Sequence, residues 1–420
     1  MPKDRVVTGI DIGSSKVSSI IASISPEGKV SVIGVSTIPS RGIKKGVVVD
    51  IDEAVETIAQ SLEGSERMAG YAVSSAFVAV NGKHISSLNS HGVVAVANQE
   101  GEITAGDVDR VTEAAQAISI PSSREIVHVI PRGFIVDNQD EIKDPVGMSG
   151  IRLEVETNII SGGATVMRNL VKCVQQVGVE VSSLVFEGVA SAEAVLTDTE
   201  KELGTVLVDI GGGTTSILVF SAGSPAYAAV LPIGGQNITN DLAVGLRMSL
   251  EEAEQVKIRL STEEILPLRP GGEREPRKHR DEIDVSDLGF EQTTVSRKLV
   301  ETIVEARMTE IFRMVGREVK RSDLGERLPA GAVFTGGAAG TLGVRKVAKK
   351  VLGLPLRIGQ PRGVTGLIDE LGSPAQAAAV GLVLYGAYFT QEGGLSRLVS
   401  RGKLGGIFAR VVEWVKSFLP

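Results

Sequence analysis

Two short segments of the chain share residue types that suit phosphate and metal binding. VVTGIDIGSSK covers residues 6–16 and VLVDIGGGTTS covers residues 206–216, which places the equivalent aspartates, Asp11 and Asp209, 198 positions apart. In each segment an apolar run ends at the aspartate, continues through Ile-Gly and small residues, and then returns to an apolar run. This internal duplication predicts two similar strand-turn-strand units.

Each of the two turns has the residue types of one half of a phosphate-binding site. Glycines allow backbone N–H groups to approach a phosphate without interference from Cβ atoms, and hydroxyl groups add donors. A carboxylate at the strand end can bind the waters around Mg²⁺, because that ion keeps several waters and takes few protein ligands. Gly-Gly also marks ordinary tight turns, and Lys16 by itself fits a solvated surface lysine, but two matched copies favour a phosphate site. The predicted phosphate-binding residues are Gly13, Ser14, Ser15, Lys16, Gly211, Gly212, Gly213, Thr214 and Thr215, with Asp11 and Asp209 as ligands of Mg²⁺ through water.

Two further glycine turns suggest where a nucleoside would lie. The turn in AVFTGGAAG precedes a helix predicted from about Thr341, and its small residues would let a flat purine ring pass. The turn in LPIGGQNITNDLAVGL precedes helices on which an acidic and a basic residue, one turn apart, could reach a ribose; an exposed ion pair is the alternative. The predicted residues are Gly234, Gly235, Glu254, Lys257, Gly336, Gly337 and Ala338.

Composition and motifs exclude several classes of protein. The chain has no GxxxxGK[ST] motif and no GxGxxG motif that opens a helix, which excludes P-loop and dinucleotide-binding folds. The single cysteine, Cys173, excludes a disulfide framework and is predicted to be a buried thiol, and the four histidines lack the spacing of zinc ligands. A net charge of -7 indicates no nucleic-acid partner.

Strand-like and helix-like patterns alternate along the 420 residues, which predicts an α/β architecture of two to four domains. Residues 83–161 read as several strands around one helix and are predicted to be an inserted subdomain. Residues 268–284, dense in charge and proline, are predicted to be a solvated loop. The apolar run 375–389 is too short to span a membrane and is predicted to be a buried core helix. The N-terminus lacks a signal-peptide pattern, so a cytoplasmic protein is expected.

The C-terminal segment has the pattern of a membrane-surface anchor. Residues 391–406 read as a flexible polar linker, and in residues 407–420 the apolar side chains fall on one side of a helix. Residues 391–420 carry five basic and two acidic residues, a net +3, so the rest of the chain carries -10. A basic amphipathic helix on a tether suits an anionic membrane surface; packing on its own domain is the alternative. The predicted membrane-binding residues are Ile407, Phe408, Arg410, Val411, Val412, Trp414, Val415, Lys416, Phe418 and Leu419.

The motifs, in their order along the chain, resemble those of the actin, sugar kinase and heat-shock ATPase superfamily. Within that superfamily they resemble most closely the bacterial FtsA cell-division family. The resemblance covers nearly the whole chain. It rests on GIDIGSSK, the insertion after VAVNG, FEGVASAEAVL, VDIGGGTTS, IGGQNITNDLAVGL with AEQVKIRL, and the terminal amphipathic segment. The chain departs from the family at Ser216, where an acidic residue commonly follows the paired threonines, and in GGAAG, which lacks a serine often found there.

The resemblance implies an actin-like two-lobed ATPase fold with a family-specific strand-rich inserted subdomain and a C-terminal amphipathic helix. It implies ATP and Mg²⁺ as ligands, with Glu187 placed to orient an attacking water, although a structural carboxylate is equally consistent and any ATPase activity would be slow. The implied division is 1–82, 162–203 and 364–390 for the first lobe; 83–161 for the insertion; 204–236 and 304–363 for the second lobe; 237–303 for a small subdomain; 391–406 for the linker; and 407–420 for the membrane helix.

The resemblance also implies a role. The chain would polymerise on the cytoplasmic side of the cell membrane at the division site, anchor filaments of FtsZ (the Z-ring) and recruit later division proteins of the divisome at the septum. Its partners would be the FtsZ C-terminal tail, bound at residues 237–303, other copies of itself, late division proteins and an anionic membrane surface. A PilM-like pilus-assembly ATPase and a small-molecule kinase of the same superfamily stay open as alternatives; the terminal helix argues against the first, and the second would need a catalytic base.

Overall fold

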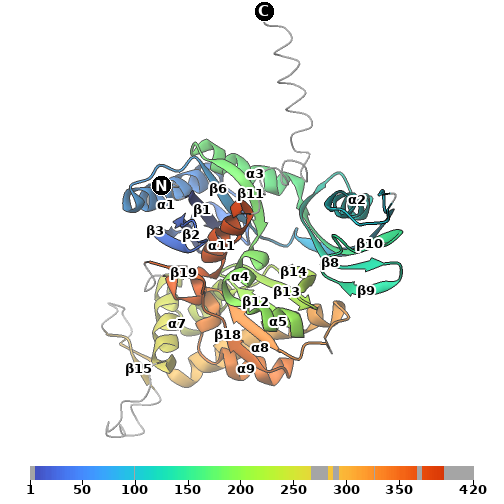
Figure 1. Ribbon diagram of the computed structural model, residues 1–420. Helices are drawn as coiled ribbons and strands as arrows, with labels where there is room; N and C mark the ends of the chain where they lie inside the picture. Colours follow the sequence, from blue (N-terminus) through green and yellow to red (C-terminus); the bar gives the residue numbers. More distant parts are fainter. Residues whose placement is uncertain are drawn as a thin grey trace, which may run out of the picture.

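The computed structural model describes residues 5–98, 100–265, 282–286, 293–325, 327–366 and 371–391. The linker from residue 392 onward and the amphipathic segment 407–420, with its predicted membrane-binding residues, lie outside this part of the chain. Two large sheets organise what is described, one in each lobe, and the inserted subdomain projects to one side (Figure 1).

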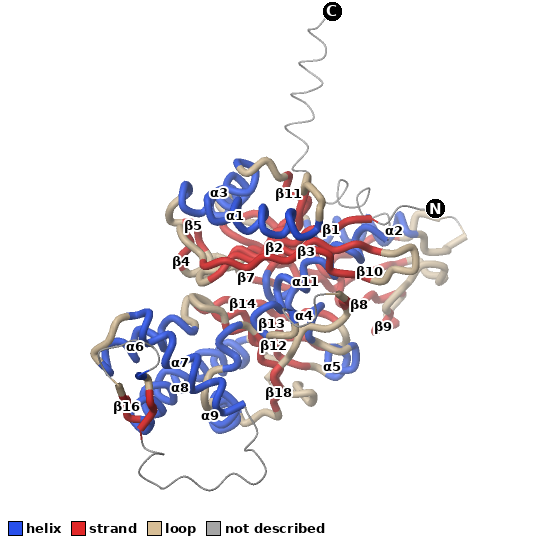
Figure 2. The backbone as a smooth tube through the Cα atoms, turned by 90° about the vertical axis from the view of Figure 1, so that its left-hand side faces the viewer, coloured by secondary structure: helices blue, strands red, loops and turns tan. Residues whose placement is uncertain are grey.

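The first lobe is built on a six-stranded sheet with the order β11-β6-β1-β2-β3-β19. Helices α1 and α3 cover one face of this sheet, and α11 with α4 covers the other (Figure 2). The side chain of Asp50 caps the start of α1 by accepting from the Glu53 N–H, and Gly70 ends it in the left-handed conformation. The elements are β1 (Arg5–Ile12), β2 (Lys16–Ile24), β3 (Val30–Pro39), β4 (Ile43–Lys44), β5 (Val47–Val48), α1 (Ile51–Ala69), β6 (Ser75–Val80), α3 (Ala164–Gln176), β11 (Glu180–Phe186), α4 (Glu187–Val195), β19 (Val364–Thr365), η4 (Pro374–Gln376) and α11 (Ala377–Gln391).

The second lobe contributes the first five strands of a nine-stranded sheet with the order β18-β17-β12-β13-β14-β7-β10-β8-β9. Helices α6 to α9 gather to one side of these strands (Figure 2). The elements are α5 (Asp198–Leu203), β12 (Thr205–Ile210), β13 (Thr215–Ser221), β14 (Ser224–Leu231), α6 (Gly235–Leu246), α7 (Leu250–Ile265), β15 (Glu282–Asp284), β16 (Thr294–Ser296), α8 (Arg297–Arg321), β17 (Ala332–Thr335), η3 (Gly337–Gly340), α9 (Val344–Leu352) and β18 (Leu356–Ile358).

The inserted subdomain has its own small core and continues the second sheet. Helix α2 packs on β7 and β10, and Val111 of α2 lies buried with Phe134, Leu153 and Val155 of the strands. Strands β14 and β7 pair at one position, Ala229 with Ser86. The Ser87 hydroxyl and the Asn158 amide add hydrogen bonds to the backbone of β14. The elements are β7 (Ser86–Ala95), α2 (Ala105–Gln116), β8 (Arg124–Val136), β9 (Gln139–Ile142) and β10 (Arg152–Gly163).

The duplicated segments fold into the predicted strand-turn-strand units, and the two copies share one register. Asp11 pairs with Ser18 across β1 and β2, and Asp209 pairs with Ser216 across β12 and β13. In each turn the N–H of the first glycine donates to a carbonyl three residues on, at 2.9 Å: Gly13 to Lys16 and Gly211 to Thr214. Both β1 and β12 also have a parallel neighbour, β6 and β17 respectively. These strands are almost wholly buried, which explains their Val- and Ile-rich sequences.

Three other predictions can be compared with the structure. Cys173 is fully buried in α3, as expected. The apolar run 375–389 forms η4 and most of α11, whose buried residues pack under β1, and within the described ranges no helix is long and apolar enough to cross a membrane. The loop prediction for 268–284 was wrong at its end, because 282–284 form β15 paired with β16; residues 268–281 lie outside the described part.

Candidate functional site

A cavity of about 90 Å³ lies where the two duplicated turns meet. Asp11 and Asp209 enter it from equivalent strand ends, and Glu187 enters it from the first residue of α4. Parallel strands bring their carboxyl ends to one edge of a sheet, which is why β1 and β6 deliver their last residues together. The lining residues are Asp11, Ile12, Gly13, Ser14, Ser15, Lys16, Gly46, Ala79, Asn81, Glu187, Asp209, Gly211, Gly212, Thr214, Gly336, Gly337, Ala375 and Ala378.

The two turns lie face to face in direct contact. A Cβ atom built on Gly212 would lie 2.7 Å from the Ser15 Oγ, and one on Gly213 would lie 2.8 Å from the Ser14 Oγ. Both distances are shorter than real Cβ contacts, so these positions have no room for a larger residue. The Ser14 hydroxyl also accepts a hydrogen bond from the Gly46 N–H at 2.9 Å. The glycines of the second turn are therefore required by the approach of the first.

Three carboxylates meet in this cavity with one lysine. Asp11 and Asp209 are 6% and 3% exposed, and Glu187 is partly buried. Burial is the main cause that raises all three pKa values; that of Asp209 rises to about 6, and the charges of Asp209 and Asp11 help to raise the pKa of Glu187 well above its usual value. Burial lowers the pKa of Lys16, and the three acids oppose that effect. The cluster has an excess of negative charge that a bound cation would relieve.

A hydrogen-bond network fixes the third carboxylate. The Asn81 amide nitrogen donates to Glu187 Oε2 and, at 2.9 Å, to the Thr214 Oγ1 of the second turn. The Ser216 hydroxyl lies 2.8 Å from Glu187 Oε2 and 3.2 Å from Asn81 Oδ1. Ser216 thus places a neutral hydroxyl beside Glu187, where an acidic side chain would add a like charge.

Two other polar side chains hold the charged residues of the turns. Lys16 Nζ donates to Gln376 Oε1 at 3.0 Å, which ties the first turn to the residue before α11. The Ser191 hydroxyl, one turn into α4, donates to Asp209 Oδ2 at 2.5 Å. These contacts orient the aspartate and the lysine toward the same cavity.

Four of the residues predicted to bind the nucleoside lie beside the second turn but do not line the cavity: Gly234, Gly235, Glu254 and Lys257. Gly235 N–H donates to the Gly211 carbonyl at 2.9 Å, and a Cβ on Gly234 would lie 2.5 Å from that carbonyl oxygen. Lys257 is buried and bonds Glu254, at 2.6 Å, together with the Thr239 hydroxyl. The structure therefore shows the i,i+3 ion pair, with Lys257 buried and Glu254 partly exposed.

The remaining predicted residues divide between the cavity and its surroundings. Gly336 and Gly337 line the cavity, whereas Ala338 lies near Gly235 and Gly213 packs on Ser14. Thr215 is fully buried and its hydroxyl donates to the Ile233 carbonyl at 2.8 Å, away from the partners of Thr214.

Sequence patterns did not predict Asn81, Ser191, Gln376 and Gly46 of this site, or its apolar lining residues Ile12, Ala79, Ala375 and Ala378. Asn81 carried a usable signal, because it is a polar residue at the end of an apolar strand followed by glycine, in VAVNG. Gln376 stood out as a polar residue at the start of an apolar run. Their partners are 106 and 360 positions away, however, and no local pattern gives such a contact.

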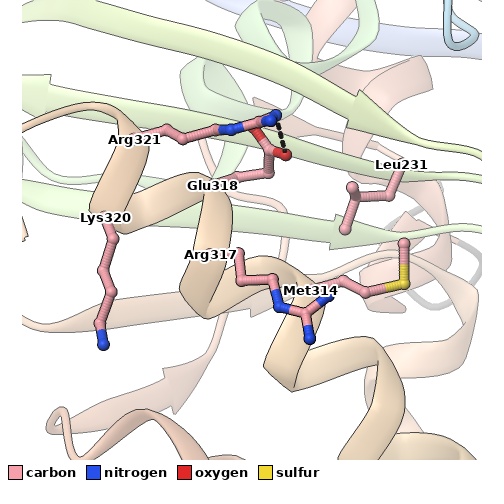
Figure 3. Close-up of a pocket in the computed structure, with 6 residues that line it drawn as sticks. All are labelled: Leu231, Met314, Arg317, Glu318, Lys320 and Arg321. Atoms are coloured by element: carbon pink, nitrogen blue, oxygen red, sulfur yellow. Dashed lines mark hydrogen bonds and ion pairs between the residues drawn. The ribbon is translucent and has the colours of Figure 1, made fainter.

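A larger, open cavity of about 510 Å³ lies elsewhere, between β14 and the end of α8 (Figure 3). Its lining includes Leu231, Met314 and Arg317, and Arg321 bonds Glu318 at its rim. Glu318 also accepts from the Tyr227 hydroxyl at 2.6 Å. No residue of either duplicated turn lines this cavity, so it is separate from the candidate site.

Comparison with protein families gives two matches. The family described as "SHS2 domain inserted in FTSA" matches residues 82–161, and the family described as "Cell division protein FtsA" matches residues 206–381.

Solved structures show the fold. The PilM-PilN type IV pilus biogenesis complex superposes with a TM-score of 0.63 at 15% identity, covering 91% of this chain and 98% of that one. MreB 5 of Spiroplasma citri bound to AMPPNP superposes with a TM-score of 0.51 at 13% identity, covering 93% of this chain and 98% of that one. The prediction of an actin-like two-lobed fold with an insertion is confirmed.

Curated relatives extend along nearly the whole chain. The cell division protein FtsA of Pseudomonas aeruginosa is 37% identical over 98% of both chains. That of Bacillus subtilis is 40% identical over 92% of this chain and 84% of its own, and that of Escherichia coli K12 is 32% identical over 98% of both. The chain therefore belongs to the FtsA family of cell division proteins.

Proposed function

We propose that this cell division protein binds ATP with Mg²⁺ between its two lobes and that its filaments tether FtsZ to the cytoplasmic face of the membrane. The observation that carries the nucleotide part is the pair of matched turns facing each other across buried Asp11 and Asp209. Backbone N–H groups, serine and threonine hydroxyls and Lys16 together provide donors for a phosphate chain from two sides. The similar fold of MreB 5, which was solved bound to AMPPNP, supports nucleotide binding by this chain.

The acidic residues fit Mg²⁺ held through its own waters. Among the described residues, no group of three or more His, Cys, Asp and Glu side chains is arranged to hold a metal ion directly. Asp11 and Asp209 are buried carboxylates with raised pKa values, so a nearby cation would stabilise their charged forms. Bound Mg²⁺ would neutralise phosphate charge there, and the two aspartates would orient its hydration shell.

The size of the cavity implies that the lobes move on binding. Pockets that enclose a small-molecule ligand occupy roughly 300 to 1,000 Å³, and the space between the turns is about 90 Å³. Since Gly212 and Gly213 touch Ser15 and Ser14, phosphate groups can enter only when the two turns separate. We infer that bound nucleotide sets the distance between the lobes.

Glu187 is the carboxylate placed to act in hydrolysis. It lines the cavity and accepts from Asn81 and Ser216, so it is placed to orient a water. Burial, together with the charges of Asp209 and Asp11, raises its pKa well above the usual value, and a bound cation would oppose that effect. From family membership we infer an ATP-binding cytoskeletal protein whose ATPase activity is low.

The tether part of the proposal rests on the sequence of the tail and on family membership. The terminal basic amphipathic segment would bind anionic lipid weakly as one copy and strongly when many copies join in a filament. Residues 237–303 would bind the FtsZ tail; Val244 (80% exposed), Leu250 (58%) and Leu299 (43%) provide apolar surface on α6, α7 and α8. The insertion would take part in filament and late-partner contacts.

Replacing Lys16 should weaken ATP binding. Calorimetric titration of the full chain should show ATP binding that depends on Mg²⁺. Lys16→Met should reduce the affinity by about ten- to a hundredfold, because a charge-assisted hydrogen bond contributes about 1.5 to 3 kcal/mol. Lys29→Met removes an exposed lysine of the same lobe and should have no effect. Wild-type chain that binds no ATP, or equal affinities for the two variants, would contradict the assignment of the site.

A further inference from the structure

We propose that His84 is a positioning residue that couples the inserted subdomain to the nucleotide site. The inference rests on the proposed nucleotide function and extends it to a route by which contacts of the insertion reach the cleft. The chain enters the inserted subdomain just after Asn81 and leaves it at Gly163. His84 lies between these two crossovers and contacts both.

The hydrogen bonds of His84 define its role. The Gly163 N–H donates to Nδ1 at 3.0 Å, so Nδ1 carries no proton. The ring nitrogen Nε2 therefore carries the proton and donates to the Asn81 carbonyl at 3.0 Å. Burial lowers the pKa of His84, which keeps the ring in this neutral form at neutral pH. One side chain thus fastens the entry strand to the exit strand of the inserted subdomain.

The glycines around the imidazole ring of His84 pack closely on it. A Cβ on Gly82 would lie 3.1 Å from His84 Cδ2, and one on Gly162 would lie 3.2 Å from Nδ1. Gly82 also has a φ of 121°, which favours glycine. The backbone at both crossovers is therefore packed tightly on the imidazole, and a displacement of either crossover would move the ring.

A displacement of either crossover would move Asn81, which bonds two residues of the nucleotide site. Its backbone carbonyl is held by His84, and its side-chain amide bonds both Glu187 and the Thr214 hydroxyl of the second turn. A shift of the inserted subdomain would alter the contact between the first lobe and the second phosphate turn.

A second histidine of the inserted subdomain bonds the backbone beside Glu187, the residue to which the Asn81 amide donates. His128, on β8, accepts a hydrogen bond from the Phe186 N–H at 2.9 Å, and Phe186 is the residue before Glu187. His128 is buried, and burial lowers its pKa to about 4, so it is a neutral acceptor at neutral pH. The inserted subdomain thus reaches the backbone beside both Asn81 and Glu187, whose side chains are bonded to each other.

Hydrogen-deuterium exchange of the full chain, read by mass spectrometry with and without Mg²⁺ and ATP, tests the coupling. In the wild type, nucleotide should slow exchange at the two phosphate turns and, by about fivefold or more, at the crossover segments 81–86 and 161–166. His84→Phe keeps a ring but removes both hydrogen bonds. It should keep the slowing at the turns, lose it at the crossovers, and weaken ATP affinity by about three- to tenfold.

Two further variants separate positioning from simple stability. His84→Gln retains a donor for the Asn81 carbonyl, so it should restore most of the ATP affinity without restoring protection at 161–166. His91→Phe changes a half-exposed histidine of the same subdomain that pairs with Glu154, and it should behave as the wild type. Far-ultraviolet circular dichroism of each variant shows that it is folded.

The outcomes are distinguishable. Crossover protection that is unchanged in His84→Phe, or exchange that rises equally throughout the chain including α1, would overturn the coupling while leaving nucleotide binding intact. A wild-type chain whose phosphate turns show no nucleotide-dependent slowing would overturn the nucleotide function and, with it, this inference.

Discussion

Asp209→Asn is expected to make the nucleotide-free protein more stable at neutral pH and to weaken its binding of Mg²⁺ and ATP. The pKa of the buried Asp209 carboxyl is about 6 in the folded state, compared with an ordinary value of 3.8. Between pH 3.8 and about pH 6, therefore, the folded state holds a proton that the unfolded state has lost. The resulting stability is present below about pH 4 and is lost as the pH rises through 6. Above pH 6 the difference amounts to about 3 kcal/mol, which asparagine would recover while still accepting from Ser191.

Urea denaturation measures this stability effect. Asp209→Asn should exceed the wild type in free energy of unfolding at pH 7.5 and approach it near pH 4, while calorimetry shows at least tenfold weaker binding of ATP in Mg²⁺. A variant less stable than the wild type at pH 7.5 would contradict the account of the buried charges.

Asp107→Asn is the matched control with the opposite sign. Asp107 is also buried, but its carboxylate accepts from Thr104, Ala97 and Arg110. Hydrogen bonds led by that of Thr104 hold the pKa of Asp107 below its usual range, so its charged form stabilises the fold. Asp107→Asn should therefore destabilise the protein at neutral pH.

Gly336→Ala is expected to disrupt the site, whereas Gly337→Ala, one residue on, should be tolerated. Gly336 has φ 87° and ψ 167°, a region that is essentially restricted to glycine. A Cβ there would lie 2.2 Å from Asp209 Oδ1 and 2.6 Å from the Ile210 carbonyl oxygen. A Cβ on Gly337 would lie 3.8 Å from the Ala375 Cβ, an ordinary contact.

The two alanine variants should differ in both stability and binding. Gly336→Ala should lower the free energy of unfolding by about 3 kcal/mol or more through strain and overlap, and should abolish measurable ATP binding. Gly337→Ala should stay within about 1 kcal/mol of the wild type. Urea denaturation and calorimetry on both variants provide the comparison, and equal effects at the two positions would show that the turn does not approach Asp209 as described.

The duplicated turns were predictable because they are local. Each is a strand, a short turn and a strand within about 20 residues, and the repeat itself gave the register that places Asp11 and Asp209 at equivalent strand ends. The buried helix α11 and the strand-rich insertion followed for the same reason, since their apolar patterns are continuous in sequence.

The closing contacts of the site were not predictable from local patterns. Asn81, Gln376 and Ser191 reach the turns through the packing of β6, η4 and α4, and their partners are distant in sequence or on another element. The Glu254 and Lys257 pair illustrates the same limit. Its helical spacing indicated a neighbouring pair, but the packing of α7 on α6 buries Lys257 against Thr239. Helical periodicity gives the face of a residue and not what covers that face.

Co-sedimentation with anionic liposomes would measure whether the C-terminal segment tethers the chain, and FtsZ with it, to a membrane. The full chain and a chain ending at Gly406 would each be mixed with liposomes, Mg²⁺ and ATP, with and without FtsZ. We expect that only the full chain pellets with liposomes and that it carries FtsZ with it. Equal pelleting of the two chains, or FtsZ that remains in the supernatant beside membrane-bound full chain, would contradict the membrane tether.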